Sequence, residues 1–316
     1  MHPWNEPIVA SLKQRLQRLP HALLVHGARG VGKLELAERI AQLLLCEHPE
    51  EARRPCGVCD ACRWQLAGNH PDFRRLEPEI LMKEPAQAAE EEGGARRGKP
   101  SSVIKVEQVR ELADFLYVGS HRGRRRVALV HPAEEMNPYA ANALLKGLEE
   151  PPAGAVFLLV SHHPARLLPT IRSRCVALPV PLPSAESALA WLAGQGVKGA
   201  GRWLAYAGGA PLRARDYAAE AEELDHLLRS PSRVEDREGL ERLAEALQKI
   251  AFDRAFSCFG LAPKYRTGAP AARPGSARAW LAYARSMGQN RLLARHPLNP
   301  GLFSLDMLAA RPEDLK

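Results

Sequence analysis

The pattern of apolar and polar positions changes along the chain, and over about the first 180 residues it predicts strands and helices in turn. Three apolar runs are typical of buried parallel strands: HALLVHG at 21–27, RRRVALVHP at 124–132 and AVFLLVS at 155–161. Helical spacing of apolar residues surrounds these runs, and it covers 5–18, 33–45, 106–118 and 137–150. Such alternation predicts an α/β fold, with a mostly parallel sheet covered by helices on both faces.

Strand patterns disappear beyond about residue 180, and the remaining sequence is helical in pattern. RLLPTIRSRC at 166–175 predicts a short helix and turn, after which VALPVPLP leads out of the α/β region. Length and pattern together predict several domains. They are an α/β domain at 1–178, a small helical domain at 179–212 and a helical domain at 213–316.

One helix of the α/β region has clear boundaries in the sequence. Asn137 is a favourable N-cap and Pro138 a favourable first helical residue, and the Pro-Pro pair at 151–152 ends the helix. Two other segments predict mobile surface loops. Residues 77–102 are rich in Glu, Ala, Gly and Pro and cannot bury much apolar area, and residues 260–276 are rich in Gly and Pro.

Composition and charge limit the function without deciding it. Of the 316 residues, 46% are hydrophobic and 25% are charged, which is ordinary for a globular protein. No apolar run reaches the roughly 20 residues of a membrane span, and the N-terminus lacks the apolar core of a signal peptide, so we expect a cytoplasmic protein. A net charge of +8 and a pI of about 9.3 fit nucleic-acid contact. The arginine-rich composition of a high-GC genome explains them equally well.

Four cysteines form the most specific metal-binding pattern in the chain. They follow the spacing C-x9-C-x2-C-x2-C and are Cys46, Cys56, Cys59 and Cys62. In a cytoplasmic protein such a cluster indicates a metal more often than disulfides. Four thiolates complete a tetrahedral Zn²⁺ site and leave no open position for water or substrate. We therefore expect a structural zinc module at about 46–70, with His48 and His70 as alternative ligands.

A glycine-rich loop follows the first predicted strand. Residues 27–34 read GARGVGKL and match the phosphate-binding pattern GxxxxGK, between a strand and a helix as this motif requires. Gly27, Gly30 and Gly32 let the backbone wrap phosphates, and Lys33 reaches their charge. The N-terminus of the following helix adds partial positive charge. The pattern predicts a site that binds the phosphates of ATP or ADP.

The groups that would bind Mg²⁺ are missing from both expected positions. Leu34 stands where a Ser or Thr hydroxyl would ligate the metal. The second strand ends in His131 and Pro132 instead of an acidic pair, and Glu134 and Glu135 lie beyond the proline, where they begin the next turn. Phosphate binding is compatible with this sequence, but Mg²⁺-assisted hydrolysis is not expected.

Two further motifs lie in the second half of the α/β region. ANALLKGLEEPP at 141–152 and SRC at 173–175 follow the glycine loop, the cysteine cluster and VEQVREL at 106–112. In sequence and order these motifs resemble those of the bacterial DNA polymerase III clamp-loader subunits, which are AAA+ proteins. The resemblance covers residues 1 to about 215. It implies an AAA+ P-loop module with an inserted zinc module, a small helical lid domain and an all-α collar domain that joins the subunits.

The resemblance also implies roles for individual residues. In this family the SRC arginine, here Arg174, reaches the ATP of a neighbouring subunit and stabilises charge in the transition state. Arg172 is the internal competitor for this role. Lys105 and Arg110, at and just inside the start of a predicted helix, match basic residues that face duplex DNA in the family's motors. Solvated surface charges are an almost equally simple interpretation.

Both sensor positions of the family are altered in this sequence. The motor subunits carry a Thr near the end of the third strand, where this chain has Ser161, His162 and His163. The second sensor is an arginine on a helix, and the aligned position is Leu212. Arg213 is one residue away, which turns its side chain by roughly 100° on a helix and makes it a poor substitute.

These features favour a clamp-loader subunit that has no ATPase activity of its own and serves as a stator. The resemblance implies a heteropentamer with motor subunits and the delta subunit, which acts on the sliding clamp and primed DNA within the DNA-directed DNA polymerase holoenzyme. Two alternatives stay open. One is an active AAA+ ATPase with an unorthodox metal site. The other is a zinc-dependent DNA-binding protein, whose cysteine module is flanked by Arg53, Arg54 and Arg63.

Overall fold

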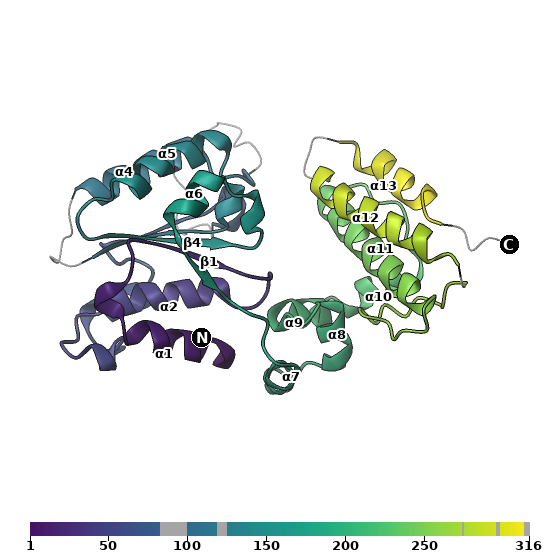
Figure 1. Ribbon diagram of the computed structural model, residues 1–316, viewed down its shortest axis with the longest axis horizontal. Helices are drawn as coiled ribbons and strands as arrows, with labels where there is room; N and C mark the ends of the chain where they lie inside the picture. The colour runs from purple at the N-terminus through teal and green to yellow at the C-terminus, as the bar shows by residue number, and fades with distance from the viewer. Residues whose placement is uncertain (83–99, 119–124, 274, 295–297, 313–316) are drawn as a thin grey trace, which may run out of the picture. The chain divides into compact units, whose positions relative to one another are not determined.

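The computed structural model of the chain describes residues 1–82, 100–118, 125–273, 275–294 and 298–312. The chain forms two compact units, Met1–Leu182 and Pro183–Lys316. Unit 1 runs from purple to teal in Figure 1, and unit 2 from green to yellow. The finer division of the second half into domains at 179–212 and 213–316 stays a prediction.

Unit 1 contains a five-stranded parallel sheet with the strand order β2-β3-β4-β1-β5. The strands are β1 Ala22–His26, β2 Phe73–Leu76, β3 Arg126–Val130, β4 Ala155–Ser161 and β5 Val176–Pro179. β4 lies between β3 and β1, with Val127 opposite Val156 and Leu24 opposite Leu159. Every residue of β3 and β4 is buried. The three predicted strands are thus confirmed, and their apolar runs reflect burial on both faces.

The two outer strands, β2 and β5, are absent from the sequence prediction. In β2 the apolar run is interrupted by Arg74 and Arg75, and β5 is an apolar segment of only four residues that ends in Pro179. Both lie at an edge of the sheet, where charged side chains and proline are tolerated. VALPVPLP leads to the end of unit 1 as predicted, but its first four residues also form a strand that pairs with β1, which the prediction did not include.

Helices cover both faces of this sheet, with α1 and α2 on one side and α4, α5 and α6 on the other (Figure 1). The α-helices are α1 Glu6–Lys13, α2 Lys33–Leu45, α3 Asp60–Leu66, α4 Val106–Tyr117, α5 Pro138–Glu149 and α6 Pro169–Arg174. Short 3₁₀ helices lie at Pro3–Asn5, Leu16–Arg18, Glu51–Arg53, Glu79–Leu81, Ala133–Glu135 and Pro164–Arg166. The helix predicted at 5–18 is shorter in the structure, where α1 ends at Lys13. Leu16 is buried by a separate 3₁₀ helix, Leu16–Arg18.

The core beneath α4 and α5 follows from their apolar spacing. Buried side chains of the two helices pack against buried side chains of β3 and β4. The helices contribute Val109, Leu112, Leu116, Leu144 and Leu148, and the strands contribute Val130, Phe157 and Leu159. The Asn137 side chain caps α5 as predicted and accepts the Ala140 backbone N–H at 2.7 Å. Gly147 allows a close approach, since a Cβ there would lie 3.0 Å from the Phe157 ring.

Most of the predicted mobile loop at 77–102 lies outside the described residues. Its described ends are joined by hydrogen bonds. The Ile80 N–H donates to the Ser101 carbonyl at 3.2 Å, and the Glu79 carboxylate accepts the Ser101 N–H at 2.9 Å. The segment therefore begins and ends at one place on unit 1.

The regular elements of unit 2, within its described residues, are all helices. Its helices are α7 Ala185–Gly194, α8 Ala200–Tyr206, α9 Pro211–Ala219, α10 Ala221–Arg229, α11 Arg237–Ser257, α12 Ala277–Leu293 and α13 Pro300–Ala309. The long helices α11 and α12 pack along one another and bury Leu243, Leu247, Trp280 and Met287. The prediction that strands disappear beyond about residue 180 is confirmed for the described part of the chain.

The Gly/Pro-rich loop at 260–276, predicted to be mobile, is tied to α11 by a buried carboxylate. Asp253 is 3% exposed, and it accepts the backbone N–H groups of Tyr265 and Thr267, each at 2.8 Å. It also accepts the Thr267 hydroxyl at 2.8 Å. Composition alone did not reveal this anchor, because the carboxylate comes from a helix that precedes the loop.

A second buried carboxylate, Glu245, organises the middle of unit 2. It accepts hydrogen bonds from Arg213, Tyr217 and Lys249, each at 2.8 Å, and Arg291 lies 3.8 Å away. Burial alone would raise the pKa of Glu245, but the charges of Lys249, Arg213 and Arg291 outweigh it and hold the pKa at about 2. Helices α9, α11 and α12 therefore meet at one ionised side chain.

Replacing Glu245 with Gln is expected to lower the free energy of unfolding by about 3–5 kcal/mol, because buried cations lose their carboxylate. The folded-state pKa is depressed, so this contribution is present above the unfolded pKa and is lost as pH falls toward about 2. Urea titrations at pH 7 and at pH 3 measure both effects. Glu222→Gln, at an exposed position on α10, removes the same charge and should cost less than about 0.5 kcal/mol. Equal losses in the two variants would contradict the assignment.

Candidate functional site

The glycine-rich loop joins β1 to α2 at the carboxyl edge of the sheet. Gly27, Gly30 and Gly32 have φ of 154°, 85° and 79°, which L side chains rarely adopt. Space is also restricted. A Cβ on Gly27 would lie 2.3 Å from the Val180 carbonyl oxygen, and a Cβ on Gly32 would lie 2.4 Å from the His2 ring. The loop thus has the tight backbone that a phosphate-binding turn requires.

The N-terminal residues close against this loop, a contact that sequence reasoning missed. The Asn5 amide donates to the carbonyls of Val31 and Gly32 at 3.2 and 3.1 Å. The Trp4 indole donates to the Val31 carbonyl at 2.9 Å, and the His2 ring stacks on Trp4 with centroids 4.8 Å apart. The aromatic and amide side chains of HPWN were the available signal, but the pattern of apolar residues does not reveal such a partner.

Lys33 lies within the loop. It is 2% exposed, and its Nζ donates to the Ala28 carbonyl at 2.6 Å. Burial lowers the pKa of Lys33 to about 8, although the charge of Glu134 opposes this shift. The side chain is therefore mostly protonated at pH 7 and close to the backbone that would hold phosphate. Its neighbour Leu34 offers no oxygen to a metal.

Three polar side chains gather beyond the ends of β3 and β4. His131 follows β3 and His162 follows β4, and their rings meet edge to face with centroids 5.4 Å apart. Glu134 is 8% exposed, and its Oε1 accepts the backbone N–H groups of His162 and His163 at 2.8 and 3.1 Å. Glu134 does lie in a turn, as predicted, but its charge also acts on Lys33. Sequence reasoning gave it no role, because its partners lie 28 and 29 residues away.

Both imidazoles are neutral near pH 7. Burial lowers the pKa of His131 to about 4 and that of His162 to about 2, and the charge of Lys33 contributes to both shifts. Mg²⁺ prefers carboxylate, carbonyl and water oxygens, whereas neutral imidazole suits zinc, copper, iron and nickel. Positions 34, 131 and 132 therefore offer none of the side-chain oxygens of a magnesium site.

Arg174 lies at the amino-terminal end of the parallel strands, whereas the glycine loop lies at their carboxyl-terminal end. It precedes β5, whose first residue Val176 pairs with Leu23 near the start of β1, whereas Gly27 follows the end of β1. From Leu23 to Gly27 the strand extends about 13 Å. The Arg174 guanidinium forms an ion pair with Glu149 at 2.6 Å and is one-third exposed. The structure therefore does not bring Arg174 together with the chain's own loop.

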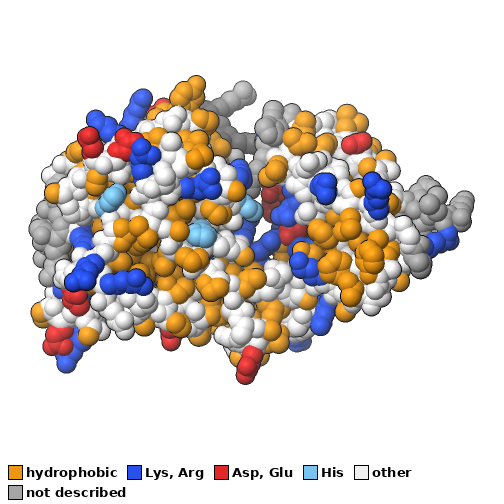
Figure 2. Space-filling model, viewed as in Figure 1, with side chains coloured by type: hydrophobic (Ala, Val, Ile, Leu, Met, Phe, Trp, Pro, Cys, Tyr) orange, Lys and Arg blue, Asp and Glu red, His pale blue; other side chains and the backbone are white. Residues whose placement is uncertain are grey.

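The remaining predicted site residues are spread over the two units. Lys105 precedes α4 and forms an ion pair with Glu79 at 2.6 Å, and Arg110 is exposed on α4. Arg213 forms an ion pair with Glu245 within unit 2, so its guanidinium is already engaged and is less suited to a sensor role. On the face shown in Figure 2, Lys and Arg side chains are distributed among hydrophobic and acidic ones over both units. The net positive charge thus does not mark a single surface in this view.

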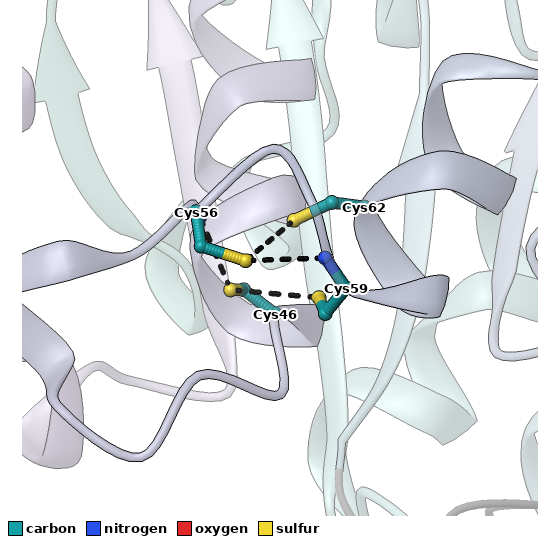
Figure 3. Close-up of side chains that lie close together, drawn as sticks. All are labelled: Cys46, Cys56, Cys59 and Cys62. Carbon is teal, nitrogen blue, oxygen red and sulfur yellow. Dashed lines mark hydrogen bonds between the residues drawn. The ribbon is translucent and has the colours of Figure 1, made fainter.

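The four cysteines converge on one point, as Figure 3 shows. Cys46 follows the end of α2, and Cys62 lies on α3. The sulfurs all lie within 4.8 Å of one another, with Cys46 and Cys59 3.9 Å apart and Cys56 and Cys62 4.0 Å apart. A tetrahedral zinc with Zn–S bonds of about 2.3 Å requires sulfurs about 3.8 Å apart. The cluster therefore fits a metal ion such as zinc.

Backbone hydrogen bonds favour the thiolate form of Cys56, whereas burial raises the pKa of the Cys46 and Cys62 thiols. The Cys59 N–H donates to the Cys56 sulfur and the Cys56 N–H to the Cys46 sulfur, each at 3.4 Å. Backbone N–H groups of Val58 and Cys59 lower the pKa of Cys56 to about 6. The two alternative ligands form other contacts, since His70 Nδ1 accepts the Asp72 N–H at 3.0 Å and His48 Nδ1 lies 3.2 Å from the Glu50 N–H. Among the described residues, the group that could hold a metal ion consists of the four cysteines and includes neither histidine.

The doubly covered parallel sheet and the glycine loop define a P-loop protein with an AAA+-like fold and a four-cysteine insertion. A DNA polymerase III gamma subunit-related protein from Thermotoga maritima has a similar fold, with a TM-score of 0.50 and 17% identity over 95% of this chain and 97% of that one. The family model described as "DNA polymerase III, delta subunit" matches residues 4–183, so the chain belongs to this family.

Its relatives within this family include subunits named delta'. DNA polymerase III subunit delta' of Pseudomonas aeruginosa is 44% identical over 219 residues, which are 68% of this chain and 60% of that protein. The delta' subunit of Escherichia coli is 35% identical over 193 residues, which are 60% of this chain and 52% of that protein. The match thus spans little more than half the length of these relatives. Among the described residues, no helix is long and apolar enough to cross a membrane.

Proposed function

We propose that the chain is the non-hydrolysing delta-prime subunit of a DNA polymerase III clamp loader, which helps to place the sliding clamp on primed DNA during replication. The observation that carries this proposal is that the glycine loop and Arg174 lie at opposite ends of the strands of unit 1, and that neither could complete a catalytic site without a neighbouring subunit. The loop at 27–34 lacks oxygen ligands for Mg²⁺, and Arg174 lies at the amino-terminal end of the strands. Such a chain is suited to act on the nucleotide of a neighbour.

Arg174 is the residue that would act on the neighbouring ATP. Its side chain is one-third exposed at the end of α6, where Glu149 binds one arm of the guanidinium at 2.6 Å and the Thr170 carbonyl binds the other at 2.9 Å. These contacts restrict the rotamers of a long side chain before a partner binds. An arginine supplied in trans stabilises the charge that develops on the transferred phosphoryl group.

The helical half of the chain would connect the subunits. We assign residues 179–212 to a lid domain and residues 213–316 to a collar that packs with motor subunits and the delta subunit in a heteropentamer. The names of the relatives, which are subunits of a polymerase assembly, support a role in a complex. Lys105 and Arg110 are the proposed contacts with the phosphates of primed DNA, which would position the duplex without reading its sequence.

The cysteine module would hold a structural zinc ion. Cys46, Cys56, Cys59 and Cys62 provide four ligands and leave no position for substrate, so the ion would stabilise residues 46–70 and take no part in chemistry. The segment has few buried apolar side chains beyond the cysteines and Ala61, which is why a metal would be needed to order it.

ATP turnover tests the proposed function. The purified chain alone should hydrolyse no ATP, whereas a mixture with motor subunits, delta subunit, clamp and primed DNA should hydrolyse ATP faster than the same mixture without this chain. Turnover by the chain alone that is lost in Lys33→Ala would instead identify an active ATPase. Tight, salt-resistant DNA binding by the isolated chain would favour the zinc-dependent DNA-binding protein, since phosphate contacts alone weaken steeply with salt.

A further inference from the structure

A pocket of about 410 Å³ within unit 2 is rich in arginine. Among its described lining residues, Arg202 comes from α8, Arg229 from α10 and Arg254 from α11, and Arg311 follows α13. Asp225 is the one acidic side chain among them. Arginine stays protonated in proteins, so four guanidiniums and one carboxylate leave these residues with a net charge of +3. Such a pocket favours a ligand that carries several negative charges.

Indole rings support three of the four arginines. The guanidinium carbon of Arg202 lies over the Trp203 ring, 4.4 Å from its centroid. Those of Arg254 and Arg311 both lie over the Trp280 ring, at 4.7 and 6.0 Å. The attraction to a ring depends on the charge of the guanidinium and uses none of its N–H donors, which match phosphate oxygens in geometry. Because Arg254 and Arg311 share one ring, an anion between them would also reduce the repulsion of their charges.

The acidic side chain of the pocket is already engaged. Asp225 accepts hydrogen bonds from both terminal nitrogens of Arg202, one of them at 3.2 Å, and lies 3.9 Å from the Arg229 guanidinium. The hydrogen bond from Arg202 holds the pKa of Asp225 below its usual range, so the carboxylate is ionised at neutral pH. Its single charge offsets only one of the four guanidiniums, and positive charge remains in excess among the described lining residues.

One wall of the pocket is formed by residues 267–270 of the Gly/Pro-rich loop. Asp253 holds this loop by accepting the N–H and the hydroxyl of Thr267, each at 2.8 Å. At Gly268 the φ of 77° is left-handed, and an added Cβ would meet no described atom within 4 Å, so the wall leaves open space at this point. A ligand would therefore meet a wall that is already ordered, which lowers the entropy cost of binding.

Size and charge together favour a small phosphate compound. The volume of about 410 Å³ lies within the roughly 300–1,000 Å³ that is typical of small-molecule sites. Arg254 is 5% exposed, and a double helix, whose phosphates lie on a convex surface, cannot reach it. Arginine binds phosphate oxygens in pairs. Linked phosphates concentrate more negative charge in a small volume than carboxylates do, so they match several arginines at once.

We propose that this pocket binds a small molecule that carries two or more linked phosphate groups, either free or as an ester. Arg254 and Arg311 hold the phosphates beside Trp280, and Arg229, whose side chain is 81% exposed, closes on them from the rim. All described lining residues belong to unit 2. The inference is therefore independent of the glycine loop and of the proposed function.

Calorimetry of the full chain with inorganic pyrophosphate in EDTA tests this proposal. The unmodified chain should bind the anion, and Arg311→Gln should weaken binding at least about tenfold, because it removes charged donors. Arg254→Gln should weaken it as well, but Arg254 is buried, so half-buried Arg311 gives the variant that disturbs folding less. Arg278→Gln, at an exposed position of α12 outside the pocket, is the matched control and should bind like the unmodified chain. An absence of binding, or equal binding by the Arg311 and Arg278 variants, would overturn the proposal.

Asp225→Asn gives a result that misfolding cannot imitate. Removing this carboxylate should strengthen pyrophosphate binding at least about threefold, because the pocket then attracts the anion more strongly. Loss of all binding in Lys33→Ala, together with unchanged binding in Asp225→Asn, would place the anion at the glycine loop and overturn the proposal.

Two further ligands identify the source of the phosphates. ADP binding that falls in Arg311→Gln supports a diphosphate ester as the ligand, and pyrophosphate binding without ADP binding supports the free anion. Binding of a tetraglutamate peptide without binding of pyrophosphate would assign the pocket to an acidic protein segment, and the proposal would be wrong.

Discussion

Arg174→Ala should abolish the stimulation of a neighbouring ATPase site while leaving this chain folded. Arginines supplied in trans are worth about 10³–10⁵ in rate in GTPases, and we expect a loss of at least about 10³-fold at the site that Arg174 serves. The measurement is steady-state ATP hydrolysis by the reconstituted loader with clamp and primed DNA. The total rate of ATP hydrolysis should fall only by the part contributed by the site that Arg174 serves. The other sites receive their arginines from other subunits.

The matched control lies two residues away on the same short helix. Arg172 is exposed on α6, so Arg172→Ala removes an equal charge and should leave hydrolysis unchanged. Arg174→Lys should restore little activity, because an ammonium lacks the planar fork of a guanidinium. Loss of activity in Arg172→Ala and not in Arg174→Ala would assign the role to Arg172. Full activity in both variants would remove the basis for a stator that acts in trans.

Removing the metal from the cysteine cluster should unfold residues 46–70 and leave the sheet intact. Structural zinc binding contributes about 10–16 kcal/mol in zinc-finger peptides, and a segment with so small a core has little else to replace it. Cys59→Ser removes one ligand and should bring the zinc content of the purified chain close to zero. Metal analysis gives the stoichiometry, and limited proteolysis locates the exposed segment.

Cys258→Ser provides the comparison for this experiment. Cys258 lies on unit 2 and is no part of the cluster, so this variant should retain one zinc ion per chain and the proteolytic pattern of the unmodified protein. A Cys59→Ser chain that keeps its zinc, or an unmodified chain that is fully protected from protease after chelation, would contradict a structural metal site.

The sequence was most informative where function depends on residues that are close along the chain. The cysteine spacing predicted all four members of the cluster, and the glycine loop was predicted with its strand and helix because the motif fixes all of them within a few positions. The cap at Asn137 belongs to the same class, since its hydrogen bond spans three residues.

Contacts between distant segments were not predictable in the same way. Trp4 and Asn5 hold a loop 26 or more residues away, and Glu134 holds the backbone after β4 from 28 residues away. Neither contact has a periodic signal. The edge strands β2 and β5 were missed for local reasons, because two arginines interrupt the apolar run of β2 and because β5 is a four-residue segment in a proline-rich stretch.

The packing of Gly27 and Gly32 has a consequence for how this loop should be studied. Both residues are confined by other parts of the chain, the Val180 backbone in one case and the His2 ring in the other. A side chain at either position would be strained even if no nucleotide ever bound. Persistence of the glycine pattern during evolution is therefore no measure of nucleotide use, and a glycine substitution would confuse misfolding with loss of ligand. Substitution of Lys33 among related sequences is more informative about phosphate binding, because a shorter side chain at this position causes no steric clash.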